Sequence, residues 1–160
     1  MAVMRTPRTA DPRVCSIDAA LKAVGEKWAL LALREIALGQ HRFDDIAFNT
    51  GAPRDILAAR LKSLEGAGIV QRRLYQERPA RYEYRLAEAG EELFAVLHAI
   101  RDWGDRFVRD DPENIVAFRH CCGAKLHIEM RCAACGEGVA PGDVTGDRDV
   151  RRSDIVHTQG

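Results

Sequence analysis

The spacing of apolar residues changes at Gly68, and this change constrains the fold more than any other feature of the sequence. Over residues 57–64, before this glycine, leucines recur at spacings of four and three, which is typical of one face of an α-helix. After it, residues 69–76 read as a β-strand, residues 77–80 as a proline-containing turn, and the tyrosine-rich residues 81–86 as a returning strand. The sequence therefore predicts a helix that leads directly into a β-hairpin with a basic tip.

Helical spacing also predicts the elements on either side of this hairpin. Apolar stripes and glycine stops indicate helices over about residues 15–24, 28–38, 43–48 and 53–67, and a longer helix over about residues 88–109. One side of the longer helix carries its apolar residues, which are Leu93, Val96, Leu97, Ile100, Trp103 and Phe107. This stripe is wider than one small core needs. The order of elements predicts a mainly α (α+β) chain, a winged helix-turn-helix with a two-stranded β-hairpin wing and a long C-terminal dimerisation helix.

The length of 160 residues suffices for one ordinary domain with a small appendage. We expect a flexible arm over residues 1–13, a winged helix-turn-helix DNA-binding and dimerisation domain over 14–112, a Cys-rich extension over 113–140 and a polar tail over 141–160. No run reaches about 18 uninterrupted apolar residues, so no transmembrane helix is expected. The first residues also lack the apolar segment of a secretory signal. These observations predict a cytoplasmic protein, in which disulfides are disfavoured.

The charge of the chain is balanced overall but uneven along it. The 24 Lys and Arg match 24 Asp and Glu, which excludes a globally basic protein. Residues 53–85 nevertheless hold eight basic and four acidic side chains, whereas residues 86–119 hold four basic and eight acidic ones. Exposed charges act over roughly 10 Å, so a basic centre can bind a polyanion locally. Two solvated faces are the alternative that charge alone leaves open.

A helix followed by a basic hairpin suits double-stranded DNA, because a helix fits the major groove and a hairpin can reach the adjacent backbone or minor groove. If the leucines over residues 57–64 face the core, the residues between them face outward. Ala58 and Ala59 are small enough for close approach to the bases. The predicted DNA-binding residues are Arg54, Asp55, Ala58, Lys62, Arg78 and Arg81. An ordinary helical domain with a solvated face is the alternative.

Seven short motifs follow one another along residues 15–109. They are Cys15, residues 25–28 (Gly-Glu-Lys-Trp), 42–46 (Arg-Phe-Asp-Asp-Ile), Leu57 with 60–65 (Arg-Leu-Lys-Ser-Leu-Glu), 68–72 (Gly-Ile-Val-Gln-Arg), Pro79 with 82–86 (Tyr-Glu-Tyr-Arg-Leu), and Trp103 with Gly104. In these motifs the chain resembles the HxlR family of bacterial winged-helix regulators, which are relatives of the MarR type. The resemblance implies a homodimeric DNA-binding transcription factor, often one that senses electrophiles or oxidants.

The sequence departs from the pattern of that family in three places. Ala87 stands where the family usually has a Thr that caps the long helix, and loss of this cap should cost about 1 kcal/mol. Ala52 and Pro53 stand where Ser or Thr usually begins the recognition helix, although Pro is compatible with a helix start. Ser16 stands where the family commonly has a Pro after the leading cysteine, and this difference bears on the reactivity of the Cys15 thiol.

Cys15 is the candidate redox-sensing residue. Arg13 lies two residues away and a helix begins beside the thiol, and both features lower the pKa of a thiol and favour the reactive thiolate. The family resemblance adds weight to this interpretation. The alternative is a small buried side chain, since cysteine is among the most buried residue types.

The other four cysteines cluster after the long helix. Residues 120–123 (His-Cys-Cys-Gly) and 132–136 (Cys-Ala-Ala-Cys-Gly) resemble the two turns of a small zinc ribbon, in which thiolates and imidazoles hold one tetrahedral ion. The predicted zinc ligands are His120, Cys122, Cys132 and Cys135, with Cys121 and His127 as alternatives. A thioredoxin-like redox pair would need a βαβ context that is missing here. Thiols without a metal are the third interpretation.

The sequence carries no catalytic constellation. Gly66 and Gly68 end a helix rather than form a phosphate-binding loop, and the adjacent carboxylates Asp44 and Asp45 point apart on a helix. We therefore expect no enzymatic activity. The competing function class is a winged-helix protein-interaction module that uses the zinc-binding extension for docking. The basic hairpin tip and the basic arm favour DNA over this alternative.

Overall fold

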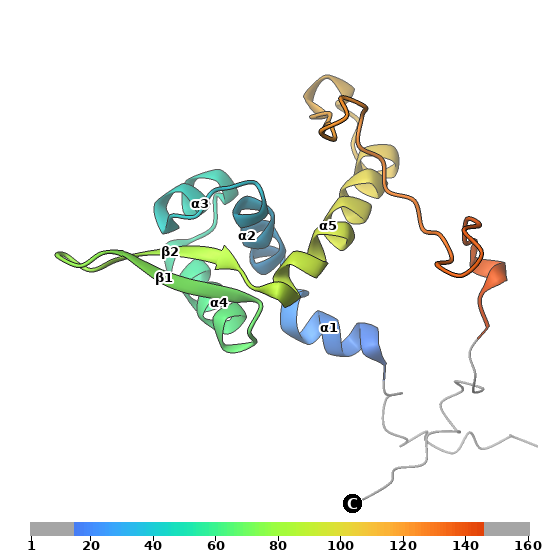
Figure 1. Cartoon of the computed structure of the whole chain (residues 1–160). Helices are drawn as coiled ribbons and strands as arrows, with labels where there is room; N and C mark the ends of the chain where they lie inside the picture. The colour runs from blue at the N-terminus through green and yellow to red at the C-terminus, as the bar shows by residue number, and fades with distance from the viewer. Residues whose placement is uncertain (1–14, 146–160) are drawn as a thin grey trace, which may run out of the picture. The chain divides into compact units, whose positions relative to one another are not determined.

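A computed structural model describes residues 15–145 of the chain (Figure 1). Residues 20–129 form one compact unit, and the described residues 15–19 and 130–145 belong to a second one. The predicted arm over residues 1–13 and the part of the predicted tail from residue 146 onward lie outside the described residues. The domain boundaries expected from the sequence stay predictions.

The order of elements is that of a winged helix-turn-helix and confirms the mixed α+β fold class. The helices and strands are α1 (Ser16–Val24), α2 (Lys27–Ala37), α3 (Phe43–Thr50), α4 (Arg54–Gly66), β1 (Val70–Gln76), β2 (Arg81–Leu86) and α5 (Glu88–Phe107). The α3 helix runs two residues further than the sequence predicted. Its extra turn is held by the Thr50 hydroxyl, which donates to the Ile46 carbonyl at 2.7 Å, and it ends at Gly51 with φ +68°. Only glycine adopts this left-handed conformation without strain.

The core lies around α2, which contacts α3, α4, α5 and β2. Its fully buried large side chains come from three helices and are Leu33, Ile46, Leu57, Leu61 and Leu64. Burying each such side chain contributes roughly 1.5–3 kcal/mol. Because three of the five belong to α4, the rotation of α4 about its axis is fixed by packing.

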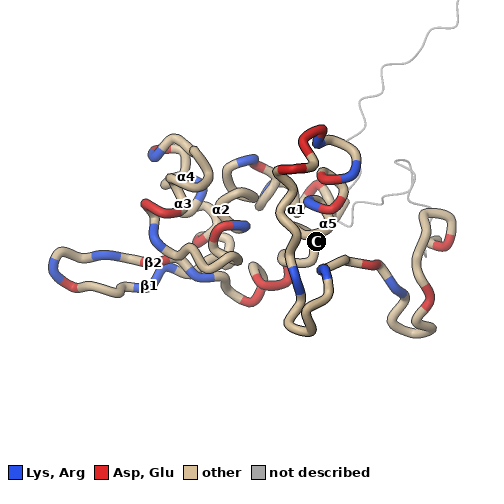
Figure 2. Tube along the Cα trace, turned by 90° about the horizontal axis from the view of Figure 1, so that it is seen from above, with Lys and Arg blue, Asp and Glu red and all other residues tan. Residues whose placement is uncertain are grey.

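The two strands form an antiparallel hairpin that extends away from the helices (Figures 1 and 2). Val70 pairs with Leu86 at its base, and the register shifts between Leu74 and Gln76 near its tip. An isolated bridge joins Arg42, just before α3, to Glu83 of β2. The base of the hairpin is thereby held against the helices, and the tip projects outward.

The α5 helix begins against the end of the α4–β1 connection. The Ala87 N–H donates to the Ile69 carbonyl at 3.0 Å, and a Cβ on Gly90 would overlap the same carbonyl oxygen. Glycine is therefore required at position 90 for this close approach.

The apolar stripe that the sequence predicted on α5 lies on one side of the helix, and only part of it is covered within the single chain. Leu93 and Leu97 are half-buried and pack against the core. The remaining stripe residues are exposed in the single chain, and they are Val96, Ile100, Trp103 and Phe107. Most of these exposed residues lie in the second half of the helix, which extends past the core (Figure 1).

Among the described residues, no helix combines the length and the apolar character that crossing a membrane requires.

Candidate nucleic-acid interface

The outward face of α4 carries the helix residues that the sequence singled out. Full burial of the leucines at positions 57, 61 and 64 turns Arg54, Asp55, Ala58 and Lys62 toward solvent, where all four are exposed. Arg54 and Lys62 therefore lie on either side of the small side chain of Ala58. This arrangement has the size and charge that allow a helix to enter a major groove.

Arg54 is held in place at the start of this face. Its guanidinium donates to Asp44 Oδ1 at 2.7 Å and lies over the Phe43 ring, 4.8 Å from the centroid. Both charged side chains are largely exposed, so the pair contributes little to folding stability. Its effect is to orient Arg54 and to offset part of its charge. The sequence did not indicate this role for Asp44.

The hairpin places a second set of basic side chains beyond the helices. Arg78 and Arg81, predicted to contact DNA, are exposed at its tip, and blue basic segments alternate with few acidic ones along it in Figure 2. Further back, Arg72 lies over the Tyr82 ring at 4.2 Å. Arg85 donates to Glu83 Oε1 at 3.1 Å and thereby lowers the pKa of that carboxyl below its ordinary value. Both the tip, with Arg78, Arg81 and Glu77, and the rest of the hairpin therefore carry more basic than acidic side chains.

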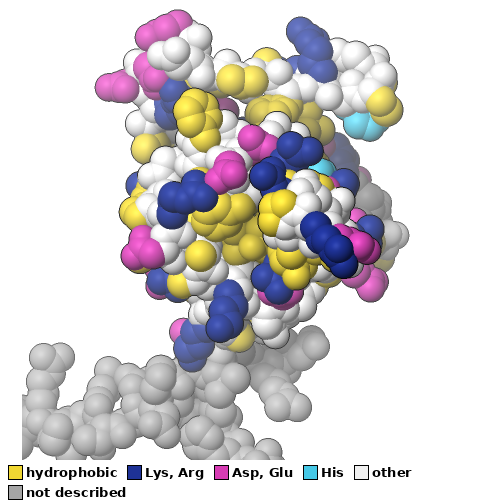
Figure 3. All heavy atoms as spheres, turned by 90° about the vertical axis from the view of Figure 1, so that its left-hand side faces the viewer, with side chains coloured by type: hydrophobic (Ala, Val, Ile, Leu, Met, Phe, Trp, Pro, Cys, Tyr) yellow, Lys and Arg dark blue, Asp and Glu magenta, His cyan; other side chains and the backbone are white. Residues whose placement is uncertain are grey.

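The side of the molecule that contains the hairpin tip has mixed charge. Figure 3 shows Lys and Arg side chains spread over this side, with Asp and Glu among them and apolar side chains between. Local basic groups rather than one continuous basic field would thus meet a nucleic acid. This agrees with the balanced charge of the whole chain.

A buried carboxylate behind this surface escaped the sequence analysis. Glu35 of α2 is only 5% exposed, accepts a hydrogen bond from Asn49 Nδ2 at 2.9 Å, and pairs with Arg34. It ties α2 to α3 and so supports the helix-turn-helix. A glutamate on an amphipathic helix is normally predicted to be exposed to solvent, so no pattern in the sequence could have identified the burial of Glu35.

Cys15 directly precedes α1. Its carbonyl oxygen accepts the Ala19 N–H at 3.0 Å, and the residue is half-buried. The thiol therefore stands at a helix N-terminus, as the sequence indicated, where the helix dipole favours a thiolate. Arg13, the other feature expected to act on this thiol, lies outside the described residues.

Residues 120–123 form the first Cys-rich turn. The Gly123 N–H donates to the His120 carbonyl at 2.8 Å, Gly123 has φ +88°, and Arg119 bridges to Lys125 across the turn. Cys121 Sγ lies 3.5 Å from His120 Nε2, so the alternative ligand Cys121 is the cysteine beside the imidazole. The other alternative, His127, has its Nδ1 3.7 Å from Asp102 Oδ2 of α5.

Residues 132–136 form the second Cys-rich turn, which is built in the same way. The Gly136 N–H donates to the Cys132 carbonyl at 2.8 Å, Gly136 has φ +77°, and Arg131 bridges to Gly138. Hydrogen bonds from the backbone of Cys135 and Ala134 lower the pKa of the Cys132 thiol. This effect favours the thiolate, which is the form that binds a metal.

The two turns belong to different compact units of the chain. Between residues 15 and 145, no three His, Cys, Asp or Glu side chains converge closely enough to hold a metal ion. The cysteines at positions 121, 122, 132 and 135 are exposed. The four-ligand zinc site therefore stays a prediction.

Known proteins resemble this chain over most of its length. The HTH-type transcriptional regulator Rv3095 of Mycobacterium tuberculosis is 40% identical over 131 residues, which cover 81% of this chain and 83% of that protein. The crystal structure of PA1607, a candidate transcription factor, is 30% identical with a TM-score of 0.75, and the match covers 84% of this chain and 95% of that one. The redox regulator HypR in its oxidized form is 28% identical with a TM-score of 0.54, covering 60% of this chain and 99% of that one.

The family assignment rests on the same elements that carry the candidate interface. Residues 23–112, from the end of α1 to the residues after α5, match the model of the HxlR-like helix-turn-helix family. Both the sequence relatives and the structural neighbours are named as transcription factors or regulators rather than as enzymes. The chain is thus a transcriptional regulator without enzymatic activity and belongs to the HxlR-like helix-turn-helix family.

Proposed function

We propose that the protein is a homodimeric regulator that binds a double-stranded DNA operator with α4 in the major groove and the β1–β2 wing on the adjacent backbone or minor groove. The observation that carries this proposal is the exposure of Arg54, Asp55, Ala58 and Lys62 on one face of α4. Arg and Lys suit the acceptor edge of guanine, Asp can accept from cytosine N4, and Ala58 can contact a thymine methyl.

The wing supplies contacts that do not depend on the base sequence. Arg78→Ala/Arg81→Ala should weaken binding to all sequences about equally and lower the slope of log affinity against log salt by about two, roughly one per lost phosphate contact. The double variant Arg109→Ala/Lys125→Ala removes two exposed basic side chains outside α4, the wing and α5; it is the matched control and should leave the slope unchanged. Unchanged operator affinity in the wing variant would contradict the wing assignment. A flat salt dependence in the parent protein would favour a protein-interaction module.

The exposed face of α5 supports the homodimer. Ile100, Trp103 and Phe107 are 52%, 56% and 68% exposed in the single chain, which is unusual for side chains of this size in succession. A two-fold dimer would cover them and would present two α4 helices to successive major grooves, about 34–36 Å apart. Light scattering should give the mass of a dimer. A monomer at micromolar concentration that still binds DNA would contradict this arrangement.

Cys15 is the proposed sensor of electrophiles. Its position at the N-terminus of α1 supports this role, and the similar protein HypR is named a redox regulator. The Cys15 thiolate would add through Sγ to a carbon electrophile such as a quinone, with the thiol proton ending on the adduct. DNA release by a quinone should therefore be lost in Cys15→Ser. Equal release in the variant and the parent would assign the response to the cysteines at positions 121, 122, 132 and 135.

Zinc is the proposed structural metal of the Cys-rich turns. The support is their common construction, in which a positive-φ glycine and a bridge across each turn present cysteines on tight loops. Each turn also has an arginine that donates to the glycine carbonyl, Arg119 to Gly123 at 2.9 Å and Arg131 to Gly136 at 3.1 Å. His120, Cys122, Cys132 and Cys135 would complete one tetrahedral site, which would be closed and structural rather than catalytic.

A further inference from the structure

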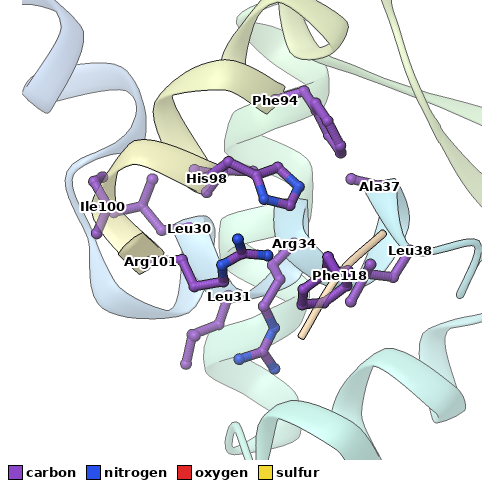
Figure 4. A pocket seen from close by; sticks show the side chains of 11 residues that line it. Leu30, Leu31, Arg34, Ala37, Leu38, Phe94, His98, Ile100, Arg101 and Phe118 are labelled. Carbon is purple, nitrogen blue, oxygen red and sulfur yellow. The ribbon is translucent and has the colours of Figure 1, made fainter. Parts of the chain in front are cut away.

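A pocket of about 270 Å³ lies between α2 and α5, and Phe118 also lines it (Figure 4). Its walls are mostly apolar and include Leu31, Ala37, Leu38, Phe94, Leu97 and Phe118. A cavity of roughly 150 Å³ with apolar walls is already large enough to bind benzene. The α2–α5 pocket can therefore hold one ring with a substituent.

Two polar atoms beside the pocket lack the partners that burial normally demands. His98 is only 6% exposed, and its Nδ1 is one of three buried side-chain nitrogens with no hydrogen-bond partner in the described part of the chain; Arg101 Nη1 is another. The ring of His98 is packed between Phe94 at 4.2 Å and Phe118 at 5.5 Å between centroids, so it cannot swing to solvent. Figure 4 shows both side chains extending from α5 into the space that α2 closes.

The charged side chains around the pocket are already paired with one another, so they do not favour an ionised ligand. Arg101 is already paired with Asp102 at 2.6 Å and lies 3.9 Å from Asp105, and Arg34 is paired with the buried Glu35. These two cations are matched by three carboxylates, so an added anion would gain little. Burial and Arg101 also lower the pKa of His98, which keeps its ring neutral near pH 7. A neutral hydroxyl satisfies both unpartnered atoms, because it donates through its hydrogen and accepts through its oxygen.

We propose that the α2–α5 pocket binds a small, uncharged, mainly apolar molecule with one hydroxyl group, of the phenol class. The hydroxyl donates to His98 Nδ1 and accepts from Arg101 Nη1, while the ring lies against the apolar walls of the pocket, such as Leu31 and Leu38. Since α2 also contacts α4, occupancy of the pocket changes operator affinity. This last step rests on the proposed function, whereas binding itself does not.

The first test is calorimetric titration of the DNA-free full chain with p-cresol, toluene and benzoate. We expect saturable binding of about one p-cresol per chain, at least about tenfold tighter than toluene or benzoate, because the pocket is built to pair a hydroxyl. The affinity should not depend on protein concentration. The absence of saturable p-cresol binding, or binding only at concentrations where the chain is monomeric, would overturn the proposal and leave water or a second copy of the chain as the occupant.

Variants locate the site. Ala37→Leu fills the pocket and should abolish binding, whereas Ala99→Leu, an exposed α5 position outside the pocket lining, is the matched control. His98→Phe should keep the ring stacking but remove the preference for p-cresol over toluene. Persistent preference in His98→Phe, or equal binding in both leucine variants, would overturn the assignment. Operator affinity should change at least about threefold with p-cresol in the parent but not in Ala37→Leu; binding without this change would overturn the coupling alone.

Discussion

The guanidinium of Arg54 and the carboxylate of Asp44 meet at 2.7 Å and join the first turn of α4 to the first turn of α3. The pair lies on the surface that would face DNA, so its two members act in opposite directions. At the proposed DNA interface, Arg54 would attract a phosphate or a base edge, whereas Asp44 would repel the DNA backbone while it holds Arg54 in place. A residue of the preceding helix would thereby modulate the contacts of α4 with DNA.

Asp44→Asn should raise affinity for DNA of any sequence, because it removes a negative charge close to the phosphates, and should alter the preference among operator variants, because Arg54 is no longer held. The free energy of unfolding should change by no more than about 1 kcal/mol, as for other exposed ion pairs. Fluorescence anisotropy over a salt series measures the affinities. Asp45→Asn is the control, since Asp45 is exposed and makes the same charge change beside the pair. Identical behaviour of the two variants would show that the Arg54–Asp44 contact has no role in recognition.

Two glycines on α5 should respond in opposite ways to the same substitution. Gly90→Ala would drive its Cβ into the Ile69 carbonyl and should destabilise the protein by about 1–3 kcal/mol, because the backbone cannot move aside without repacking. Gly104→Ala meets no atom within 4 Å and should stabilise the helix by about 0.5–1 kcal/mol. Urea unfolding of both variants measures the difference. Equal effects would mean that α5 does not approach Ile69 as described.

The stability of the protein should fall as the pH drops below about 6.5. The pKa of His98 is lowered, first by burial and then by Arg101, with Asp102 acting in the other direction. The unfolded chain therefore binds a proton at higher pH than the folded chain does, and the folded state loses stability as the pH falls toward the lowered value. His98→Phe should flatten the curve of unfolding free energy against pH between about 5 and 7. An unchanged curve in this variant would exclude His98 as the cause.

Protein purified without chelator should contain about one zinc per chain, which Cys135→Ser and Cys122→Ser should reduce strongly. Cys15→Ser lies outside the predicted ligand set and is the control. Elemental analysis measures the metal. Less than about half an equivalent in the parent would count against the four-ligand site, and full zinc in Cys122→Ser with loss in Cys121→Ser would assign the ligand to Cys121.

The order of helices and strands, and the face of α4 that is exposed to solvent, could both be predicted from the sequence. The leucine spacing before Gly68 located α4, and the strand pattern after it located the wing. Each pattern leaves few ways to bury its apolar side chains. Which part of the apolar stripe of α5 is covered within the chain was not predictable in the same way. Leu93 and Ile100 look alike in a periodic pattern, and only the length of the neighbouring core decides which of them is covered.

The buried polar groups were also beyond sequence reasoning. Glu35 and His98 lie on amphipathic helices where polar side chains normally face water, and their burial depends on how closely α3, α5 and Phe118 approach α2. Such distances follow from the packing of several elements at once. Local periodicity therefore located the exposed face of α4 but not the α2–α5 pocket.

The contact of Gly90 with the Ile69 carbonyl lies near one end of α5, so a small rotation of the helix about this contact would move its other end furthest. From Gly90, which lies against the Ile69 carbonyl, the helix extends for about 25 Å to its last residue, Phe107. A rotation of only about 5° at this contact would move the far end of the helix by about 2 Å, as follows from that length. Because Ile69 directly precedes β1, the same small rotation would also tilt the wing, so a displacement along α5 and a change in the reach of Arg78 and Arg81 would be two ends of one rigid-body motion.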